Sequence, residues 1–111
     1  MKVSIVVPVY NSALMLKELT QRINKTMDSI DLGNNFELIL INDFSSDNSW
    51  SVIKELIQQY SYIKGINLAE NFGQHNAIMA GFNNCVGDFI ITIDDDLQHQ
   101  PEFIPDILKT L

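Results

Sequence analysis

The chain turns from apolar to acidic within residues 88–99, which read DFIITIDDDLQH. The apolar half is rich in β-branched residues, as in the inner strands of parallel sheets, which are covered on both faces. In extended backbone alternate side chains point the same way, so we expect Asp94 and Asp96 to face one side and Asp95 the other. Ligands of open α/β sheets bind beyond the carboxyl ends of the strands. The position of these acids therefore predicts a ligand site.

Three carboxylates this close repel one another and need solvent, protons or a cation to compensate them. A hard divalent ion, Mg²⁺ or Mn²⁺, is one such compensation, because one or two carboxylates can hold it while phosphate oxygens and water complete its shell. A solvated acidic turn without metal is the alternative. A calcium loop of the EF-hand type fits poorly, since His99 stands where that loop needs its glycine.

The composition bounds the class of protein. With 111 residues, 46% of them hydrophobic, the chain is long enough for one compact domain and too short for two. A net charge of -7 at pH 7 argues against nucleic acid or an anionic membrane surface as a non-specific partner. Cys85 is the only cysteine, so a reducing compartment is expected. No apolar run approaches the roughly 18 residues of a membrane span.

Strand patterns and helix patterns alternate four times along the chain. The third strand pattern contains Gly65 and is expected at an edge of the sheet. The alternation, without repeats or linkers, predicts an α/β fold with a right-handed, mainly parallel sheet and helices on both faces. The last helical pattern reaches Leu111 without a stop signal, so we expect more protein to follow. The expected strands are residues 3–8, 36–41, 62–68 and 89–93.

The helix patterns between these strands carry predictions of their own. Asn11 and Ser12, in the turn after the first strand, can cap the first helix. The third helix has a small-residue face that would permit close approach to the sheet or to a ligand, formed by Ala77, Ala80 and Gly81. The apolar stripe of the first helix is Leu16, Leu19, Ile23, Met27 and Ile30, and the apolar side of the last helix is Ile104, Ile107, Leu108 and Leu111.

The turn after the first strand, PVYNS at residues 8–12, contains no glycine. Neither a G-x-G-x-x-G fingerprint nor a G-x-x-x-x-G-K-[ST] loop occurs anywhere in the sequence, so phosphates must be bound without these backbone cradles. The acidic cluster could do so by recruiting a cation. Asp43, at the end of the second strand, could accept hydrogen bonds from a base or a sugar. Alternatively, together with Ser45, Ser46 and Asp47, it could cap the next helix.

Four segments carry most of the polar residues near the expected strand ends. They are VVPVYN (6–11), INDFSSD (41–47), NFGQHNA (71–77) and DDDLQHQPE (94–102). Together, and in this order, they resemble family 2 glycosyltransferases with the GT-A fold, in the bacterial branch similar to dolichyl-phosphate mannose synthase. The resemblance covers essentially the whole chain and implies the N-terminal part of a catalytic domain. It implies a metal-dependent, inverting transfer of sugar from a UDP- or GDP-sugar, with Mn²⁺ or Mg²⁺ as cofactor.

The resemblance also assigns roles to individual residues. It places the metal on Asp94 and Asp96 of the D-x-D motif, with Gln98 as a further ligand, and implies that Asp95 reaches the ribose of the donor. It implies that the nucleotide-sugar pocket is formed by Pro8, Val9, Tyr10, Asn11, Asp43, Asn71, Asp94 and Asp95.

The acceptor implied by the resemblance is a polyprenyl phosphate or a precursor of a cell-surface polysaccharide. The catalytic base and any membrane contact would lie beyond Leu111, so we expect the fragment alone to be inactive. The expected location is the cytoplasm, or the cytoplasmic face of the membrane for the full-length protein.

The chain departs from the family pattern at four positions. Asn42 stands where the first of two aspartates is usual, and Phe44 where glycine is common. Glu70 replaces a frequent arginine, which leaves more of the diphosphate charge to the metal. Asp95 occupies a position that is often alanine in this branch.

Two other functions remain open from the sequence. One is a nucleotide-sugar-binding domain without activity. The other is a receiver-like signalling domain that binds Mg²⁺, which is disfavoured because a receiver needs acids after its first strand, where this chain has PVYN at residues 8–11.

Overall fold

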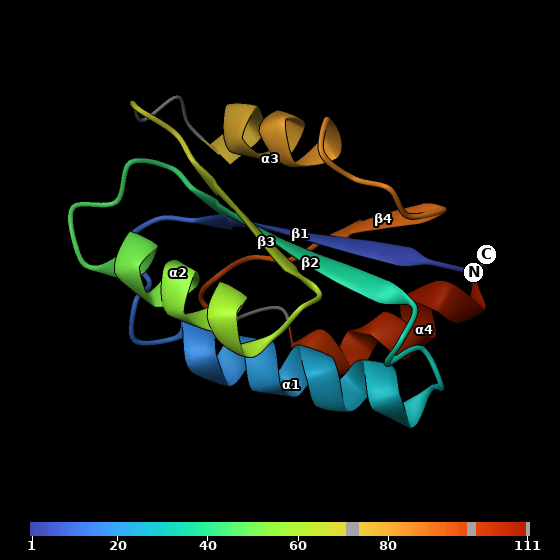
Figure 1. Cartoon of the computed structure of the whole chain (residues 1–111). Helices are drawn as coiled ribbons and strands as arrows, with labels where there is room; N and C mark the ends of the chain where they lie inside the picture. The colour runs from blue at the N-terminus through green and yellow to red at the C-terminus, as the bar shows by residue number, and fades with distance from the viewer. Residues whose placement is uncertain (71–73, 98–99, 111) are drawn as a thin grey trace.

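Four parallel strands form a sheet in the order β3-β2-β1-β4 (Figure 1). The computed structural model describes residues 1–70, 74–97 and 100–110. Helices and strands alternate along this chain as the sequence patterns predict. The elements are β1 (Val3–Val9), α1 (Leu16–Ser29), β2 (Phe36–Asn42), α2 (Ser49–Gln59), β3 (Ile63–Asn67), α3 (Gln74–Phe82), β4 (Phe89–Thr92), the 3₁₀ turn η1 (Pro101–Phe103) and α4 (Ile104–Lys109).

β1 is the central strand of the sheet. It pairs with β2 from Val3↔Phe36 onward and with β4 from Val3↔Phe89 onward. All residues of β1 and β2 are buried, as expected for strands covered on both faces. The prediction of an edge position for β3 is confirmed. The prediction that β4 is covered on both faces is wrong for the described residues, because β4 is the other edge and Ile90 is 43% exposed.

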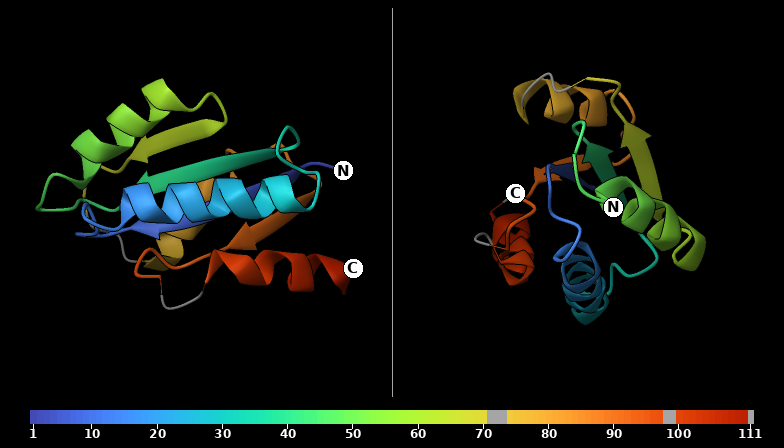
Figure 2. Two further views of the ribbon diagram at one scale, coloured as in Figure 1. Left: turned by 90° about the horizontal axis from the view of Figure 1, so that it is seen from below. Right: turned by 90° about the vertical axis from the view of Figure 1, so that its left-hand side faces the viewer.

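Helices cover both faces of the sheet, as predicted. Figures 1 and 2 show α1, α2 and α4 on one face and α3 on the other. The expected apolar stripe of α1 lies in the larger core, where Leu16, Leu19, Ile23 and Met27 are fully buried. Among the described helices, none combines the length and the apolar character needed to cross a membrane.

The smaller core lies under α3, on the face of Val6, Ile39 and Ile41. A glycine on this helix permits the close approach: a Cβ atom added to Gly81 would lie 2.5 Å from Cγ1 of Val6. The small-residue face predicted for this helix is therefore its contact with the sheet.

The direction in which strands are added reverses at β1. The chain builds β2 and β3 on one side of β1 and then crosses to the other side to form β4. At the carboxyl ends of the strands, β1 is followed by α1 and β4 by η1 and α4, which lie on one face of the sheet, whereas β3 is followed by α3 on the other face. Ligands of open α/β sheets bind at such a switch point, so the fold places the acids that follow β4 at the expected position.

A buried carboxylate joins the strands at the opposite, amino end of the sheet. Glu37 in β2 accepts hydrogen bonds from the Ser4 hydroxyl at 2.5 Å and the Val86 amide at 2.7 Å, and its Oε1 lies 2.8 Å from Nζ of Lys64. Burial by itself raises the pKa of the Glu37 carboxyl, but the Lys64 ammonium, the Ser4 hydroxyl and the Val86 amide outweigh it and hold the pKa below its ordinary value.

The Glu37 network leads to a prediction about pH-dependent stability. Glu37→Gln should lower the free energy of unfolding at pH 7 by about 2 kcal/mol, because a charge-assisted pair with Lys64 is lost. The folded-state pKa of Glu37 is lowered, so the native carboxylate stabilises the fold above the ordinary glutamate pKa of 4.5 and loses this effect as the pH falls below it. Urea unfolding from pH 7 to pH 3 should therefore show the difference closing.

The matched control for this prediction is Glu55→Gln, since Glu55 is exposed and its Oε2 lies 3.9 Å from Nζ of Lys17. It should change stability by less than about 0.5 kcal/mol at every pH. A constant deficit of Glu37→Gln across the pH range would contradict the role assigned to the Glu37 charge.

Candidate functional site at the carboxyl end of the sheet

The turn after β1 and the acids after β4 meet at the switch point. Oδ2 of Asp95 accepts a hydrogen bond from the backbone N–H of Tyr10 at 2.8 Å and another from the hydroxyl of Ser12. Two segments that are more than eighty residues apart in the chain are joined in this way. The structure thus brings together the two parts of the site that the sequence predicts most specifically.

The acids do not continue the geometry of the strand. β4 ends at Thr92, Asp95 and Asp96 lie in a turn, and Leu97 has a φ of 62°. The expectation that the side chains of residues 94–96 alternate is therefore wrong, because such alternation requires extended backbone. Asp94 is half-buried and Asp96 is exposed, so both carboxylates lie at the surface end of the sheet.

Asn11 joins the turn after β1 to the loop after β2. Its backbone has a φ of 51°, a left-handed conformation that asparagine tolerates better than most residues. Its Oδ1 accepts hydrogen bonds from the amides of Ser46 at 2.8 Å and Asp47 at 3.3 Å and from the Ser46 hydroxyl at 3.2 Å. Its own amide donates to Oγ of Ser45 at 3.0 Å. The side chain of Asn11 thus holds two loops together.

Asp47 makes the corresponding connection from the β2 loop. Its Oδ1 accepts from the Ser49 amide at 2.9 Å and the Ser49 hydroxyl at 2.6 Å, and its Oδ2 accepts from the Ala13 amide at 3.2 Å. Burial tends to raise the pKa of Asp47, but the bonds from Ser49 and Ala13 hold it below its ordinary value. Asp47 therefore accepts the Ser49 amide at the start of α2. In the capping alternative, this role belongs to a group of residues that includes Asp43.

The predicted capping of α1 is not observed. The turn containing Asn11 and Ser12 was expected to cap this helix, but α1 begins at Leu16 with Met15 as its N-cap and without a side-chain bond there. The polar atoms of both residues are engaged with neighbouring loops instead. Sequence reasoning missed Ser12, Asp47 and Ser49 as connecting residues, although two loops rich in residues that bond backbone amides were a usable signal.

Asn42 is the last residue of β2, and Asp43 follows it. Asp43 is 4% exposed, and its amide donates to the carbonyl of Val9 at 2.9 Å. Nδ2 of Asn42 donates to Oδ1 of Asn67 at 2.8 Å, which joins the ends of β2 and β3. A hollow of about 320 Å³ lies here; its lining is Asn42, Phe44, Ser45, Trp50, Asn67, Leu68 and Ala69.

The other residues assigned to the nucleotide pocket differ in exposure. Pro8 and Val9 are buried within β1, and Val9 belongs to the larger core, so it offers a ligand only its backbone. Tyr10 is 51% exposed at the carboxyl end of the sheet. Asn71 and Gln98 lie outside the described residues.

The described loop segments at the carboxyl end of the sheet carry no Lys or Arg. No Lys or Arg occurs in residues 10–15, 43–48, 68–70 or 93–97. Within the described ranges, no group of three His, Cys, Asp or Glu side chains could hold a metal by itself. Asp94 and Asp96 supply two carboxylates, the hard oxygen donors that Mg²⁺ and Mn²⁺ prefer, and a site of this kind is completed by phosphate oxygens and water.

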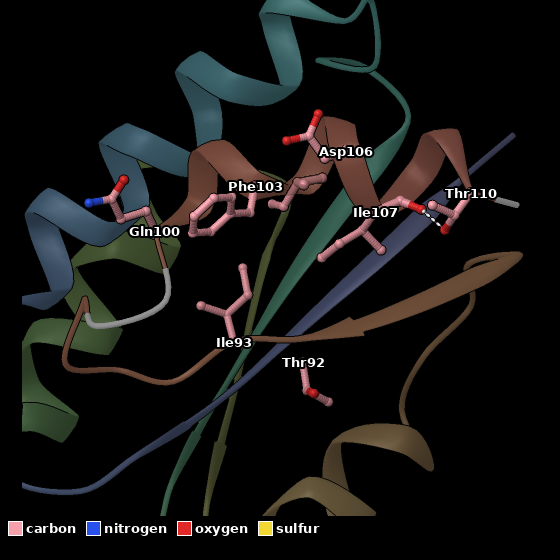
Figure 3. Close-up of a pocket in the computed structure, with 8 residues that line it drawn as sticks. Thr92, Ile93, Gln100, Phe103, Asp106, Ile107 and Thr110 are labelled. Atoms are coloured by element: carbon pink, nitrogen blue, oxygen red, sulfur yellow. Dashed lines mark hydrogen bonds between the residues drawn. The ribbon is translucent and has the colours of Figure 1, made fainter.

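An apolar hollow of about 560 Å³ lies between β4 and α4, next to the acids (Figure 3). The side chains of Ile93, Phe103 and Ile107 point toward it. Ile107 was expected on the buried side of the last helix, but it is 46% exposed here, while Ile104 is buried. The lining offers a diphosphate few hydrogen-bond donors, so the polar end of the sheet is the better candidate for a charged ligand.

The sequence is similar to those of known proteins. The sequence pattern of the family described as Glycosyl transferase family 2 matches residues 4–111. The chain is 50% identical over 107 residues to the undecaprenyl-phosphate 4-deoxy-4-formamido-L-arabinose transferase of Shewanella sediminis (strain HAW-EB3). This match covers 96% of the chain and 32% of the relative, so the chain spans about a third of that protein's length.

Solved structures share the fold. The mannosyltransferase PcManGT from Pyrobaculum calidifontis, in complex with GDP-Man and Mn²⁺, superposes with a TM-score of 0.76 at 20% identity, covering 86% of this chain and 27% of that one. S. aureus TarS 1-349 in complex with UDP-GlcNAc gives a TM-score of 0.72 at 24% identity, also over 86% of this chain and 27% of its own. At these identities the likeness shows the fold alone, which is the GT-A fold.

The connections of Asn11 can be tested by three substitutions. Asn11→Asp should keep the free energy of unfolding within about 0.5 kcal/mol, because a carboxylate accepts the same hydrogen bonds. Asn11→Gly keeps the left-handed backbone but removes the side chain, and should cost about 1–2 kcal/mol. Asn11→Ala should cost about 1 kcal/mol more than Asn11→Gly, because it adds backbone strain. Equal stability of the Gly and Asp variants in urea unfolding would contradict this role.

Proposed function

This chain belongs to glycosyl transferase family 2, and from this premise we propose that it is the nucleotide-sugar-binding part of a metal-dependent, inverting glycosyltransferase. The donor is a UDP- or GDP-sugar. Membership in this family also removes the receiver-like alternative. The single observation that carries the proposal is the pair Asp94 and Asp96 at the switch point of the sheet, in a set of loops without Lys or Arg.

The absence of Lys and Arg from these loop segments favours a cation as the partner of a bound diphosphate. A diphosphate that approached the three acids after β4 directly would meet like charge, which is costly at the edge of a core. Two carboxylates together with phosphate oxygens and water match the coordination preferred by Mg²⁺ and Mn²⁺. The proposed ligands are Asp94 and Asp96, with Gln98 as the third, and a divalent ion bound there would act as a Lewis acid on the leaving diphosphate.

The remaining residues of the site would bind and orient the nucleoside. Tyr10 is half exposed and bonds to Asp95 through its amide, and Pro8 sets the direction of the backbone leading to it. Asp43 lies at the adjoining strand end with its backbone anchored to β1, so its carboxylate would meet a base or ribose from a fixed position. Asn11 and Asn71 complete the proposed pocket, Asn11 chiefly by holding the turn in place.

The acceptor that we propose is a polyprenyl phosphate. The relative that is 50% identical is named as an undecaprenyl-phosphate transferase. A phosphate acceptor is already anionic and needs no strong protein base, whereas a sugar hydroxyl would need one. The proposed setting is the synthesis of cell-wall or surface polysaccharide precursors at the cytoplasmic face of the membrane.

A binding domain without turnover is the second candidate. The chain spans about a third of the length of its relative, so most of that protein lies outside the matched region. This candidate predicts metal-dependent binding of the donor by this chain and no transfer.

Substitution of a proposed metal ligand tests the function. Asp96→Ala should weaken binding of UDP- or GDP-sugar in the presence of Mn²⁺ by at least about 100-fold, since metal coordination supplies several kcal/mol. Isothermal titration calorimetry, first with Mn²⁺ and then with EDTA, measures this. Transfer by the full-length protein should be abolished with it.

The matched control is Asp106→Ala, which removes an exposed aspartate from α4. It should leave donor binding unchanged. Donor binding that survives both EDTA and Asp96→Ala would refute the metal-dependent mechanism, and metal-dependent binding without transfer by the full-length protein would favour the second candidate.

A further inference from the structure

We propose that Asp95 is a positioning residue, which holds the acidic segment against the turn after β1 and thereby sets the geometry of Asp94 and Asp96 for a divalent ion. This inference rests on the proposed function. It goes beyond the role implied by the family resemblance, in which Asp95 contacts the ribose of the donor.

The hydrogen bonds of Asp95 carry the argument. The Tyr10 amide and the Ser12 hydroxyl both donate to the same oxygen, Oδ2. Bonds from an amide and a hydroxyl to a carboxylate are charge-assisted and stronger than neutral ones. Oδ2 of Asp95 therefore holds the turn after β1 through two strong bonds.

The turn after β1, to which Asp95 is hydrogen-bonded, also makes hydrogen bonds to other loops. The amide of Ser12 donates to Oγ of Ser49 at 3.1 Å, at the start of α2. Asn11, one residue earlier, accepts from the amides of Ser46 and Asp47. The hydrogen bonds of Asp95 thus connect the acidic segment to a turn that is itself bonded to the loop after β2 and to the start of α2.

The chain beyond the acids is anchored as well. Nε and Nη2 of Arg22 in α1 donate to Oε2 and Oε1 of Glu102 at 3.1 and 2.5 Å. The Arg22 guanidinium holds the pKa of the Glu102 carboxyl below its ordinary value. The acidic segment is thus anchored before it by the Ile93 amide, which donates to the Val6 carbonyl at 3.0 Å, and beyond it by Glu102. Asp95 supplies the anchor that lies between Asp94 and Asp96, and its loss removes that anchor.

Small shifts matter at a site of this type. Mg²⁺ demands nearly ideal octahedral geometry, and the site supplies few protein ligands. Removing a group that orients metal ligands typically lowers metal affinity about 10–100-fold. We therefore expect the effect of losing Asp95 on metal binding to be in this range.

Three variants separate positioning from direct ligation. Asp95→Ala should weaken binding of Mn²⁺, measured by electron paramagnetic resonance with UDP or GDP present, by at least about 10-fold. Asp95→Asn should stay within about 3-fold, because its amide oxygen accepts from the same donors. Ser12→Ala should produce an intermediate loss, and it should add nothing in the double variant with Asp95→Ala. Hydrogen exchange without metal should show the Tyr10 amide losing protection in Asp95→Ala.

The matched control is Asp88→Ala. Oδ2 of Asp88 accepts the Lys2 amide at 2.9 Å at the amino end of β4, so the substitution removes the same type of bond far from the acids. It should leave Mn²⁺ affinity unchanged. Circular dichroism identifies any variant that fails to fold, and Ser12→Ala, which keeps every charge, then carries the test.

The outcomes distinguish this inference from the proposed function. Wild-type Mn²⁺ affinity in Asp95→Ala would overturn the positioning role while leaving the function intact. An Asp95→Asn loss equal to that of Asp95→Ala, with no effect of Ser12→Ala, would show that the Asp95 charge acts directly and would also overturn it. Absence of Mn²⁺-dependent nucleotide binding by the unaltered protein would overturn the proposed function and the inference with it.

Discussion

Backbone amides at the carboxyl end of the sheet need acceptors, and this requirement organises the site. The loops after β1, β2 and β4 leave the sheet ladder, so their N–H groups must bond elsewhere. Three short side chains meet this need across the loops: Asp95 takes the Tyr10 amide, Asn11 takes the amides of Ser46 and Asp47, and Asp47 takes the Ala13 amide. Each bond joins two different loops. The hydrogen bonds that satisfy these backbone amides therefore also hold the turn after β1, which is part of the proposed nucleotide-sugar pocket, beside the acids.

The distribution of charge separates the two ends of the sheet. At the amino end, Glu37 is buried but compensated by Lys64 and by neutral donors. At the carboxyl end, the loop segments that carry Asp94, Asp95 and Asp96 contain no Lys or Arg. One end of the sheet thus neutralises its acid within the protein, while the other would reach its lowest free energy with a bound cation. This contrast is the physical basis for assigning ligand binding to the carboxyl end.

Much of the fold followed from residue patterns. The apolar runs predicted the four strands, the stripe of α1 predicted its buried face, and Gly65 indicated the edge position of β3. These features depend on neighbours in the chain, which a sequence shows directly. Predictions failed where distant segments intervene: Asn11 and Ser12 looked like helix caps but bond to other loops, and Ile107 looked buried but lines an open hollow.

The candidate site was also predicted only in part from the sequence. Local order along the chain was enough to place carboxylates after a buried strand, to exclude the glycine-rich phosphate loops, and to connect the four motifs with glycosyl transferase family 2. The order of residues along the chain did not show which groups donate hydrogen bonds to those carboxylates. Asp95 meets Tyr10 and Ser12 across more than eighty residues because the strand order reverses at β1, and a hydrogen bond depends on distance in space, which only the folded sheet defines.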